Sequence, residues 1–242
     1  MDTIKLQKNG VKMIAHRGLS GIERENTYPA FVAAGNRSYF GIETDVHVTR
    51  DGKFVIIHDE TTERVSLGKI NLNVENCTFD EIKDVELPDL DGSTSRRDIK
   101  IPLLCDYISI CKKYGKICVL ELKNRFKSED IKRMVEEIKG LGYLENVIFI
   151  SFSYENCADL RALLPDATIQ FLTMEVMSDS LTQLLAKNRL DLDIYYPRIN
   201  AEWIEKLHKL GIKVNVWTCD NRDDAESLAN LGVDFITSNI LE

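Results

Sequence analysis

Residues 116–151 read KICVLELKNRFKSEDIKRMVEEIKGLGYLENVIFIS, and this stretch decides the fold class. Both of its ends, residues 116–122 and 147–151, are short apolar runs typical of fully buried strands. Between them, residues 129–141 repeat apolar side chains at helical spacing. A strand, a helix and a strand in this order predict a βαβ unit, in which the two strands run parallel.

The same alternation continues on both sides of this unit. Eight buried-strand patterns alternate with helical patterns, and one extra strand pattern at 54–57 follows the second strand after an Asp51-Gly52 turn. The eight strands are predicted at residues 12–15, 41–48, 116–122, 147–151, 168–172, 193–196, 213–218 and 233–237. The helices are predicted at 27–34, 103–114, 129–141, 154–164, 180–187, 201–210 and 223–231.

Short signals mark several helix ends. Thr78 and Glu81 form a capping-box sequence, and Ser128 precedes two acids as an N-cap residue would. Gly211 and Gly232 follow predicted helices, where glycine commonly ends a helix. These signals predict where the helices begin and end.

Strands that are apolar throughout need cover on both faces, which leaves a doubly wound open sheet or a closed barrel. Eight βα repeats in 242 residues favour the (β/α)8 TIM barrel. No G-x-G-x-x-G sequence opens the first helix, which removes the usual sign of a dinucleotide-binding sheet. We predict an α/β chain forming a single domain over residues 1–242, with a small insertion after the second strand at about 60–101.

Composition excludes several classes of function. With 31 Lys and Arg against 39 Asp and Glu, the net charge of −8 argues against nucleic acid and against an anionic membrane surface as partners. No apolar run approaches the roughly 20 residues of a membrane anchor, and the first residues lack the apolar core of a secretion signal. The six cysteines form no C-x-x-C pair, so we expect reduced thiols and a cytoplasmic location.

Ionisable residues gather where the predicted strands end. In a barrel the carboxyl ends of the strands form the catalytic face, so four strand ends would bring these residues to one rim. The residues are His16 and Arg17, Glu43 and Asp45, His58, and Glu121 and Lys123.

The three acids predict a metal site. Glu43 and Asp45 alternate along one strand and therefore share a face, and Glu121 ends the strand at 116–122. Carboxylates this close cannot all stay ionised unless a cation neutralises them, and oxygen ligands suit Mg²⁺ or Ca²⁺. The alternative is a salt-bridged cluster without a metal.

The remaining rim residues suit phosphoester cleavage. His16 and His58 titrate near neutral pH and can act as an acid–base pair, while Arg17 and Lys123 can hold a phosphate. Either histidine could instead be purely structural. Trp217 ends its predicted strand at the same rim, where it would contact the substrate or pack in the core.

These residues and their order resemble the glycerophosphodiester phosphodiesterase family. The resemblance runs from about Ile14 to the end of the sequence and depends on five motifs in order. The motifs are His16-Arg17-Gly18, Glu25-Asn26-Thr27, Glu43-x-Asp45, His58-Asp59 and Glu121-x-Lys123.

The resemblance implies a TIM barrel with an insertion after the second strand. It also implies the metal-dependent cleavage of small glycerophosphodiesters to glycerol 3-phosphate and an alcohol, with attack by the substrate's own glycerol hydroxyl. The implied roles are metal binding by Glu43, Asp45 and Glu121, acid–base catalysis by His16 and His58, and phosphate binding by Arg17 and Lys123. Asn26 would help to order the site.

Three features depart from the family pattern. Arg24 stands where a proline commonly precedes the Glu-Asn-Thr motif, and residues 235–239 lack the acid often found after the threonine, so we assign them no role. The sequence stops at Glu242, where relatives commonly continue into a helix. We expect that flank to be open, or covered by the N-terminal segment or by a partner, as in a homo-oligomer.

Two other functions remain open at this stage. A lysophospholipase D-type enzyme would need an apolar surface beside the rim, and residues 67–90 are mixed in character. A catalytically inactive barrel that serves as a binding module would have lost a histidine or a metal ligand, and all five are present.

Overall fold

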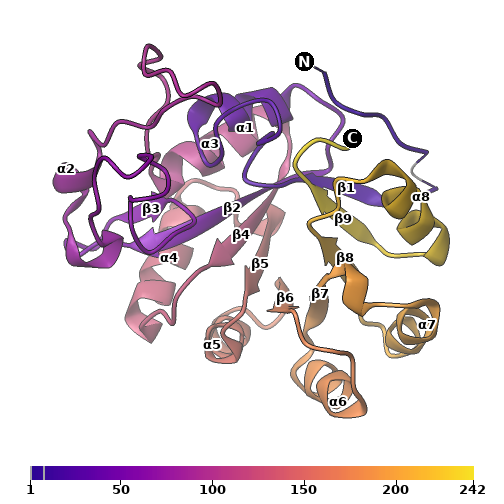
Figure 1. Ribbon diagram of the computed structural model, residues 1–242. Helices are drawn as coiled ribbons and strands as arrows, with labels where there is room; N and C mark the ends of the chain where they lie inside the picture. The colour runs from indigo at the N-terminus through magenta and orange to yellow at the C-terminus, as the bar shows by residue number, and fades with distance from the viewer. Residues whose placement is uncertain (1, 8) are drawn as a thin grey trace.

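The computed structural model describes residues 2–7 and 9–242. Met1 and Lys8, which the predicted domain includes, lie outside the described residues. Eight parallel strands follow one another around a ring, which closes because β1 pairs with both β9 and β2. The helices lie outside this ring (Figure 1). The chain therefore forms the predicted TIM barrel.

The strand order around the barrel is β1-β9-β8-β7-β6-β5-β4-β2, with β3 added antiparallel to β2. The strands are β1 (Lys12–Ala15), β2 (Gly41–Val48), β3 (Phe54–Ile56), β4 (Ile117–Leu122), β5 (Val147–Ser151), β6 (Thr168–Thr173), β7 (Asp191–Tyr195), β8 (Val214–Trp217) and β9 (Phe235–Ser238).

Each barrel strand from β1 to β8 is followed by a helix before the next barrel strand. The α-helices are α1 (Tyr28–Gly35), α2 (Phe79–Ile82), α3 (Leu104–Tyr114), α4 (Ser128–Gly140), α5 (Tyr154–Leu163), α6 (Asp179–Asn188), α7 (Ala201–Lys209) and α8 (Arg222–Leu231). Three short 3-10 turns are η1 (Val74–Asn76), η2 (Leu144–Asn146) and η3 (Tyr196–Arg198).

Most helix signals of the sequence are confirmed. Thr78 and Glu81 form the capping box of α2, and Gly232 ends α8 at a φ of 91°, in the left-handed region that glycine adopts most easily. The predicted cap at Ser128 is wrong, since α4 already includes Ser128. The Ser128 hydroxyl donates instead to Asp159 on α5, 2.8 Å away. The strand predicted at 193–196 is β7, which begins two residues earlier, at Asp191, and ends at Tyr195 because Tyr196 begins a 3-10 turn.

The insertion follows the β2–β3 hairpin and carries its own small core. Apolar residues of β3 pack there against residues of the insertion, among them Val74, Ile82 and Ile101. Figure 1 shows this segment with α2 to one side of the barrel. The insertion is thus held by its own apolar contacts and borders the rim next to β2.

The register of the strands separates an apolar floor from a polar rim. Inside the barrel, Ile14, Val119, Ile148 and Phe235 belong to one buried apolar cluster. Further toward the carboxyl ends of the strands, the interior positions carry ionisable and amide side chains. Because catalytic sites of such barrels form at this end, the floor supports the site from below.

The two ends of the described chain lie together. Ile4 pairs with Leu241 in a parallel bridge, and the Leu6 N–H donates to the Glu242 carbonyl over 3.0 Å. The N-terminal segment therefore runs along the residues that follow β9. Of the three arrangements expected for this flank, this is the one in which the N-terminal segment covers it. Within residues 2–7 and 9–242, no helix combines the length and the apolar character needed to cross a bilayer.

Candidate active site

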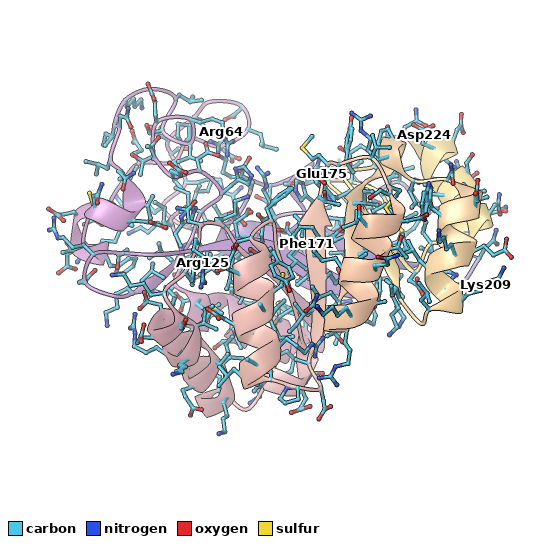
Figure 2. The ribbon with its side chains drawn as sticks, turned by 90° about the horizontal axis from the view of Figure 1, so that it is seen from below. Arg64, Arg125, Phe171, Glu175, Lys209 and Asp224 are labelled. Atoms are coloured by element: carbon cyan, nitrogen blue, oxygen red, sulfur yellow. The ribbon has the colours of Figure 1, made fainter. Side chains whose placement is uncertain are left out.

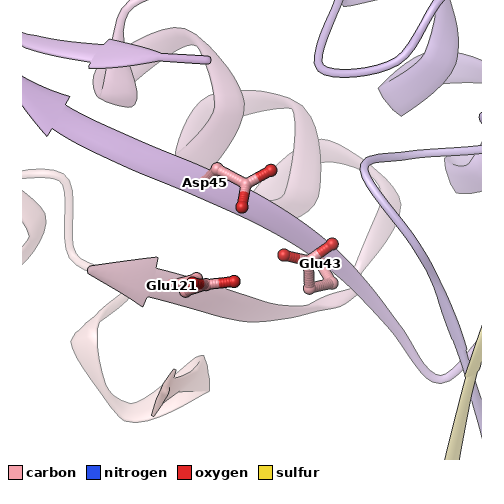
Figure 3. Close-up of side chains that lie close together, drawn as sticks. All are labelled: Glu43, Asp45 and Glu121. Atoms are coloured by element: carbon pink, nitrogen blue, oxygen red, sulfur yellow. The ribbon is translucent and has the colours of Figure 1, made fainter. Parts of the chain in front are cut away.

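Three carboxylates meet inside the barrel, as predicted. Glu43 and Asp45 lie on β2, and Glu121 lies on β4 directly opposite Asp45 in the strand register. One oxygen from each lies within 4.8 Å of the others, and all three side chains are buried. Figure 3 shows the three carboxylates on neighbouring strands, with Glu43 and Glu121 facing the same space as Asp45.

Two cations lie against this acidic cluster. Lys123 Nζ is 2.7 Å from Glu121 Oε1 and 3.4 Å from Asp45 Oδ1, and Arg17 Nε is 3.5 Å from Asp45 Oδ2. Burial disfavours the charge on Asp45, but Lys123 and Arg17 outweigh it and hold the pKa of Asp45 below its usual range. Asp45 therefore stays ionised.

The other two carboxyls behave differently. Burial, followed by the charge of Asp45, raises the pKa of Glu121 to about 7. Burial and the neighbouring carboxylates Asp45 and Glu121 raise the pKa of Glu43 well above its usual range. The cluster is therefore short of positive charge, even with Lys123 and Arg17 present.

The donor set fits a hard divalent cation. All three candidate ligands offer carboxylate oxygens, and Asp45 Oδ1 is buried and accepts no hydrogen bond from a described residue. Oxygen ligands of this kind suit Mg²⁺ and Ca²⁺, and an added cation would favour the ionised forms of Glu43 and Glu121. The residues present therefore fit the predicted metal.

The loop after β1 wraps tightly around the acids. Arg17 has a left-handed φ of 53°, and its backbone N–H donates to Glu43 Oε2 over 2.8 Å. Gly18 follows with a φ of 76°, and a Cβ at this position would lie 2.7 Å from the Ala30 backbone. The glycine of the His-Arg-Gly sequence is therefore required for steric reasons, because only glycine fits between this loop and α1.

Asn26 contacts a metal-ligand candidate directly. Its Nδ2 donates to Asp45 Oδ2 over 2.7 Å, and its Oδ1 accepts from the Thr44 hydroxyl at 2.7 Å. Both ends of the amide are thus occupied, and Asn26 is buried. This arrangement orients the Asp45 carboxylate, consistent with an ordering role.

His16 has a partner that sequence reasoning missed. Its Nδ1 lies 2.7 Å from Asn239 Oδ1, from the segment after β9 to which we had assigned no role. The Asn239 side-chain amide donates to Asp220 Oδ2 over 2.5 Å, and its backbone N–H donates to Asp220 Oδ1 over 2.7 Å. Because the carboxylate accepts from the amide nitrogen, the amide oxygen faces His16.

This contact sets which nitrogen of His16 carries the proton. Asn239 Oδ1 can only accept, so His16 Nδ1 donates and Nε2 is left with its lone pair. That Nε2 lies 4.0 Å from Glu43 Oε2, at the pocket. Burial and the Arg17 charge lower the pKa of His16 to about 4, so the ring is neutral at neutral pH.

His58 has a charged partner instead. Its Nδ1 lies 2.6 Å from Asp59 Oδ1, and Arg64 of the insertion donates to both oxygens of Asp59, at 2.6 and 3.0 Å. Arg64 also donates twice to Glu25, which in turn accepts from Arg17. The insertion therefore connects the two histidine-bearing loops.

Burial lowers the pKa of His58, and the nearby Asp45 partly opposes this. Burial disfavours the charge on Asp59, but its bonds to Arg64 and His58 outweigh burial and lower the pKa of Asp59 to about 2. The ionised Asp59 carboxylate therefore stabilises a proton on the His58 ring.

His47 is fully buried beneath this loop, where its Nε2 lies 3.2 Å from the His58 carbonyl oxygen. His47 therefore supports the His58 backbone from outside the pocket.

One pocket, about 430 Å³ to its open mouth, brings most of the predicted residues together. Trp217 lines it and packs edge to face on Phe152, with ring centroids 5.6 Å apart. In Figure 2, Arg64 of the insertion and Glu175 after β6 lie toward the same edge of the molecule, which holds the carboxyl ends of the strands. Lining the pocket are His16, Arg17, Glu43, His58, Glu121, Lys123, Ile150, Phe152, Leu172, Asp193, Trp217, Thr218 and Thr237.

The family model of the glycerophosphoryl diester phosphodiesterases matches residues 16–241. The chain belongs to this family. A glycerophosphodiester phosphodiesterase of Caldanaerobacter subterraneus is 30% identical to this chain, over 94% of this chain and 93% of its own length. Another, from Bacillus altitudinis, is 29% identical over 93% of each chain.

Solved structures agree with this assignment. A glycerophosphodiester phosphodiesterase from Parabacteroides distasonis superposes with a TM-score of 0.79 at 28% identity, over 96% of this chain and 94% of its own. A phosphodiesterase from Oleispira antarctica, solved with the product sn-glycerol-3-phosphate, gives a TM-score of 0.85 at 25% identity, over 95% and 93%. As a glycerophosphoryl diester phosphodiesterase family member, the chain is an enzyme of the phosphodiester hydrolase class.

Proposed function

We propose that this protein hydrolyses glycerophosphodiesters such as glycerophosphocholine to glycerol 3-phosphate and an alcohol, with a divalent cation and a histidine acid–base pair. The observation that carries the proposal is the meeting of three buried carboxylates, two cations and two histidines at one pocket. The relatives named above and the product bound to the Oleispira antarctica protein support the substrate class.

In this proposal Glu43, Asp45 and Glu121 hold the cation, Mg²⁺ or Ca²⁺. When bound, such an ion withdraws charge from the phosphate oxygens and makes phosphorus easier to attack. Arg17 and Lys123 bind the same phosphate from the side of the pocket. Arg17 suits this task because Glu25 already holds its guanidinium in place, 3.0 Å away.

The environments of the two histidines suggest separate roles. His16 is neutral, bonds only to a neutral amide through Nδ1, and offers Nε2 as the base that takes the proton from the attacking glycerol hydroxyl. His58 lies beside the Asp59 carboxylate, which opposes the effect of burial on its pKa and so favours His58, rather than His16, as the acid that protonates the departing alcohol. Water then opens the cyclic phosphate: the neutral His58 takes a proton from the attacking water, and the protonated His16 returns its proton to the glycerol oxygen.

A coupled assay tests the proposal. Purified protein is incubated with glycerophosphocholine, first with chelator and then with Mg²⁺, Ca²⁺ or Mn²⁺, and glycerol 3-phosphate is measured with its dehydrogenase. We expect no release with chelator and release after metal is added. The absence of metal-dependent release from every glycerophosphodiester tried would overturn the proposal.

A specific observation also favours a second substrate class. Exposed apolar side chains follow β5 and β6 at the end of the barrel that holds the pocket, namely Phe152, which lines the pocket, Met174, and Val176 with 67% of its surface exposed. Such a patch can pack against the acyl chain of a lysophospholipid in a lysophospholipase D-type reaction. Lysophosphatidylcholine in the same assay, with choline as the measured product, distinguishes the two substrates.

A further inference from the structure

One carboxyl in the pocket has no part in the chemistry proposed above. Asp193 lies on β7, is only 2% exposed, and lines the pocket on the side away from β2. Its Oδ1 atom is buried without a hydrogen-bond partner in the described part of the chain. A buried polar atom without a partner is unfavourable, so its presence in a ligand pocket calls for an explanation.

The polar residues around Asp193 do not supply the missing partner. Asn215, its neighbour in register on β8, donates to Gln170 over 3.0 Å and accepts from Thr237 over 3.3 Å. The Asn215 amide therefore has one partner at each end, and neither of them is Asp193. On the other side, Asp193 lies in register with Leu172, which offers only carbon atoms.

A second unpartnered group faces the same pocket. Trp217 Nε1 is buried and donates to no described atom, and Trp217 and Asp193 both line the cavity. The wall between them and the acidic cluster includes the apolar side chains of Ile150 and Leu172. This side of the pocket therefore combines an apolar wall with a carboxyl and an indole N–H, both able to bond a ligand.

The carboxyl on this wall is better suited to a hydroxyl than to a cation. Burial, with a further contribution from the Glu121 charge, raises the pKa of Asp193 well above its usual range and so favours its neutral form. A neutral carboxyl has one donor and one free acceptor, which matches an alcohol that both donates and accepts. A quaternary ammonium group would be attracted by the ionised form of Asp193 and gains no hydrogen bond from the neutral form.

We propose that Asp193, together with Trp217 Nε1, binds the terminal hydroxyl of the substrate's glycerol group and so selects glycerol-containing diesters. The inference rests on the proposed function, which puts the phosphate against Arg17 and Lys123. The glycerol carbons then pack on Leu172 and Ile150, and the terminal hydroxyl reaches Asp193. The second hydroxyl remains free to attack phosphorus.

Two substrates and three variants test this subsite. The first substrate is glycerophosphocholine, and the second is the choline phosphodiester of propane-1,2-diol, which lacks only the terminal hydroxyl and keeps the attacking one. We expect wild-type kcat/KM to be at least about 10²-fold lower on the second substrate, since a site built to bond a hydroxyl rejects analogues that lack it. In Asp193→Leu this ratio should fall to within about threefold.

Conservative and control variants keep the test decisive. Asp193→Asn retains a donor and an acceptor and should keep most of the discrimination, even if Asp193→Leu folds poorly. Asp191→Asn changes a carboxyl on the same strand that accepts from the Lys213 N–H, 2.9 Å away, and should leave the ratio unchanged.

Two results would overturn the inference. One is a wild-type enzyme that uses both substrates equally well, which would mean that Asp193 bonds only water. The other is a ratio that survives unchanged in Asp193→Leu, which would indicate a structural role. A wild-type protein that cleaves neither substrate refutes the proposed function itself, so the two failures are distinguishable.

Discussion

The pocket has two unlike sides. The side formed by β1, β2 and β4 carries ionisable groups, each held by a hydrogen bond or an ion pair, as with Arg17 on Glu43 and Lys123 on Glu121. The side formed by β5 to β8 carries aromatic and aliphatic side chains, together with Asp193 and Trp217, each of which has a polar atom with no hydrogen-bond partner among the described residues. Both sides are part of one continuous barrel.

The difference indicates that the two sides have different functions, catalysis on the first and substrate recognition on the second. Groups that must transfer protons or bind charge need fixed orientation, and the first side provides it through contacts with the loop after β1 and the insertion. Groups that recognise a neutral, variable ligand benefit from an apolar wall with a few free bonding positions. We therefore expect substitutions on the first side to lower kcat and those on the second to change substrate choice.

The largest expected effect comes from the histidines of the charged side. His16→Ala or His58→Ala removes one partner of the acid–base pair and should lower kcat by about 10²–10⁴-fold on glycerophosphocholine. Metal affinity, measured calorimetrically with Mn²⁺, should change little because neither histidine is a proposed ligand. His208→Ala, on α7 where the ring bonds Asp234, is the matched control and should retain full activity. A loss below tenfold in both site variants would refute the division.

A second test separates metal binding from proton transfer. Glu121→Gln removes one charge from the carboxylate cluster while preserving its shape, and should weaken Mn²⁺ affinity by at least about 10²-fold, since even residues that only support a ligand cost 10–100-fold. Glu129→Gln, an exposed acid at the start of α4, is the control. Unchanged metal affinity in Glu121→Gln would contradict the ligand assignment.

Much of this division was predictable from sequence. Buried parallel strands are apolar along their whole length, so the eight strands were visible as short apolar runs such as residues 117–122. Alternation along a strand puts Glu43 and Asp45 on one face, and the barrel rule puts Glu121 beside them. The charged side could therefore be assembled from local patterns.

The partners of these groups could not be predicted in the same way. His16 and Asn239 are 223 positions apart, and their contact depends on the closure of β1 against β9. Arg64 reaches Asp59 and Glu25 only because the insertion folds back on its own core. Asp193 looked like an ordinary strand residue, since nothing in the sequence marks a buried carboxyl that lacks a partner.

A third test concerns the contact that orients His16. Asp220→Ala leaves the Asn239 amide free to turn, so the His16 proton is no longer confined to Nδ1. We expect kcat to fall about tenfold with little change in KM, less than the roughly 10²–10⁴-fold contribution of the base itself, because the ring remains in place. The ¹⁵N chemical shifts of the His16 ring should show a mixture of tautomers, which loss of stability alone would not produce. Asp223→Ala, exposed in the first turn of α8, should change neither quantity. An unaltered Nδ1–H signal in Asp220→Ala would contradict this role.

The smallest expected effect is a pH-dependent change in stability on the charged side. In the folded protein the pKa of Glu121 is raised to about 7 by burial and by Asp45, whereas in the unfolded chain it is close to 4.5. The stability that Glu121 contributes is therefore complete below about pH 4.5 and lost as pH rises to 7. His16 acts in the opposite direction, because burial lowers its pKa to about 4 and its contribution is lost as pH falls from about 6.5.

Because the two contributions oppose each other in the wild type, the measurement that isolates Glu121 is a difference. In chelator, the Tm of Glu121→Gln minus that of wild type should increase between pH 5 and 7.5, by about 2–4 °C for each kcal/mol that ionisation of Glu121 costs. Mg²⁺ at saturating concentration should reduce this slope, since the cation favours the ionised carboxylate of the wild type. A Tm difference that stays constant with pH would mean that Glu121 is ionised without a metal, and the charged side would then be balanced by Lys123 and Arg17 alone.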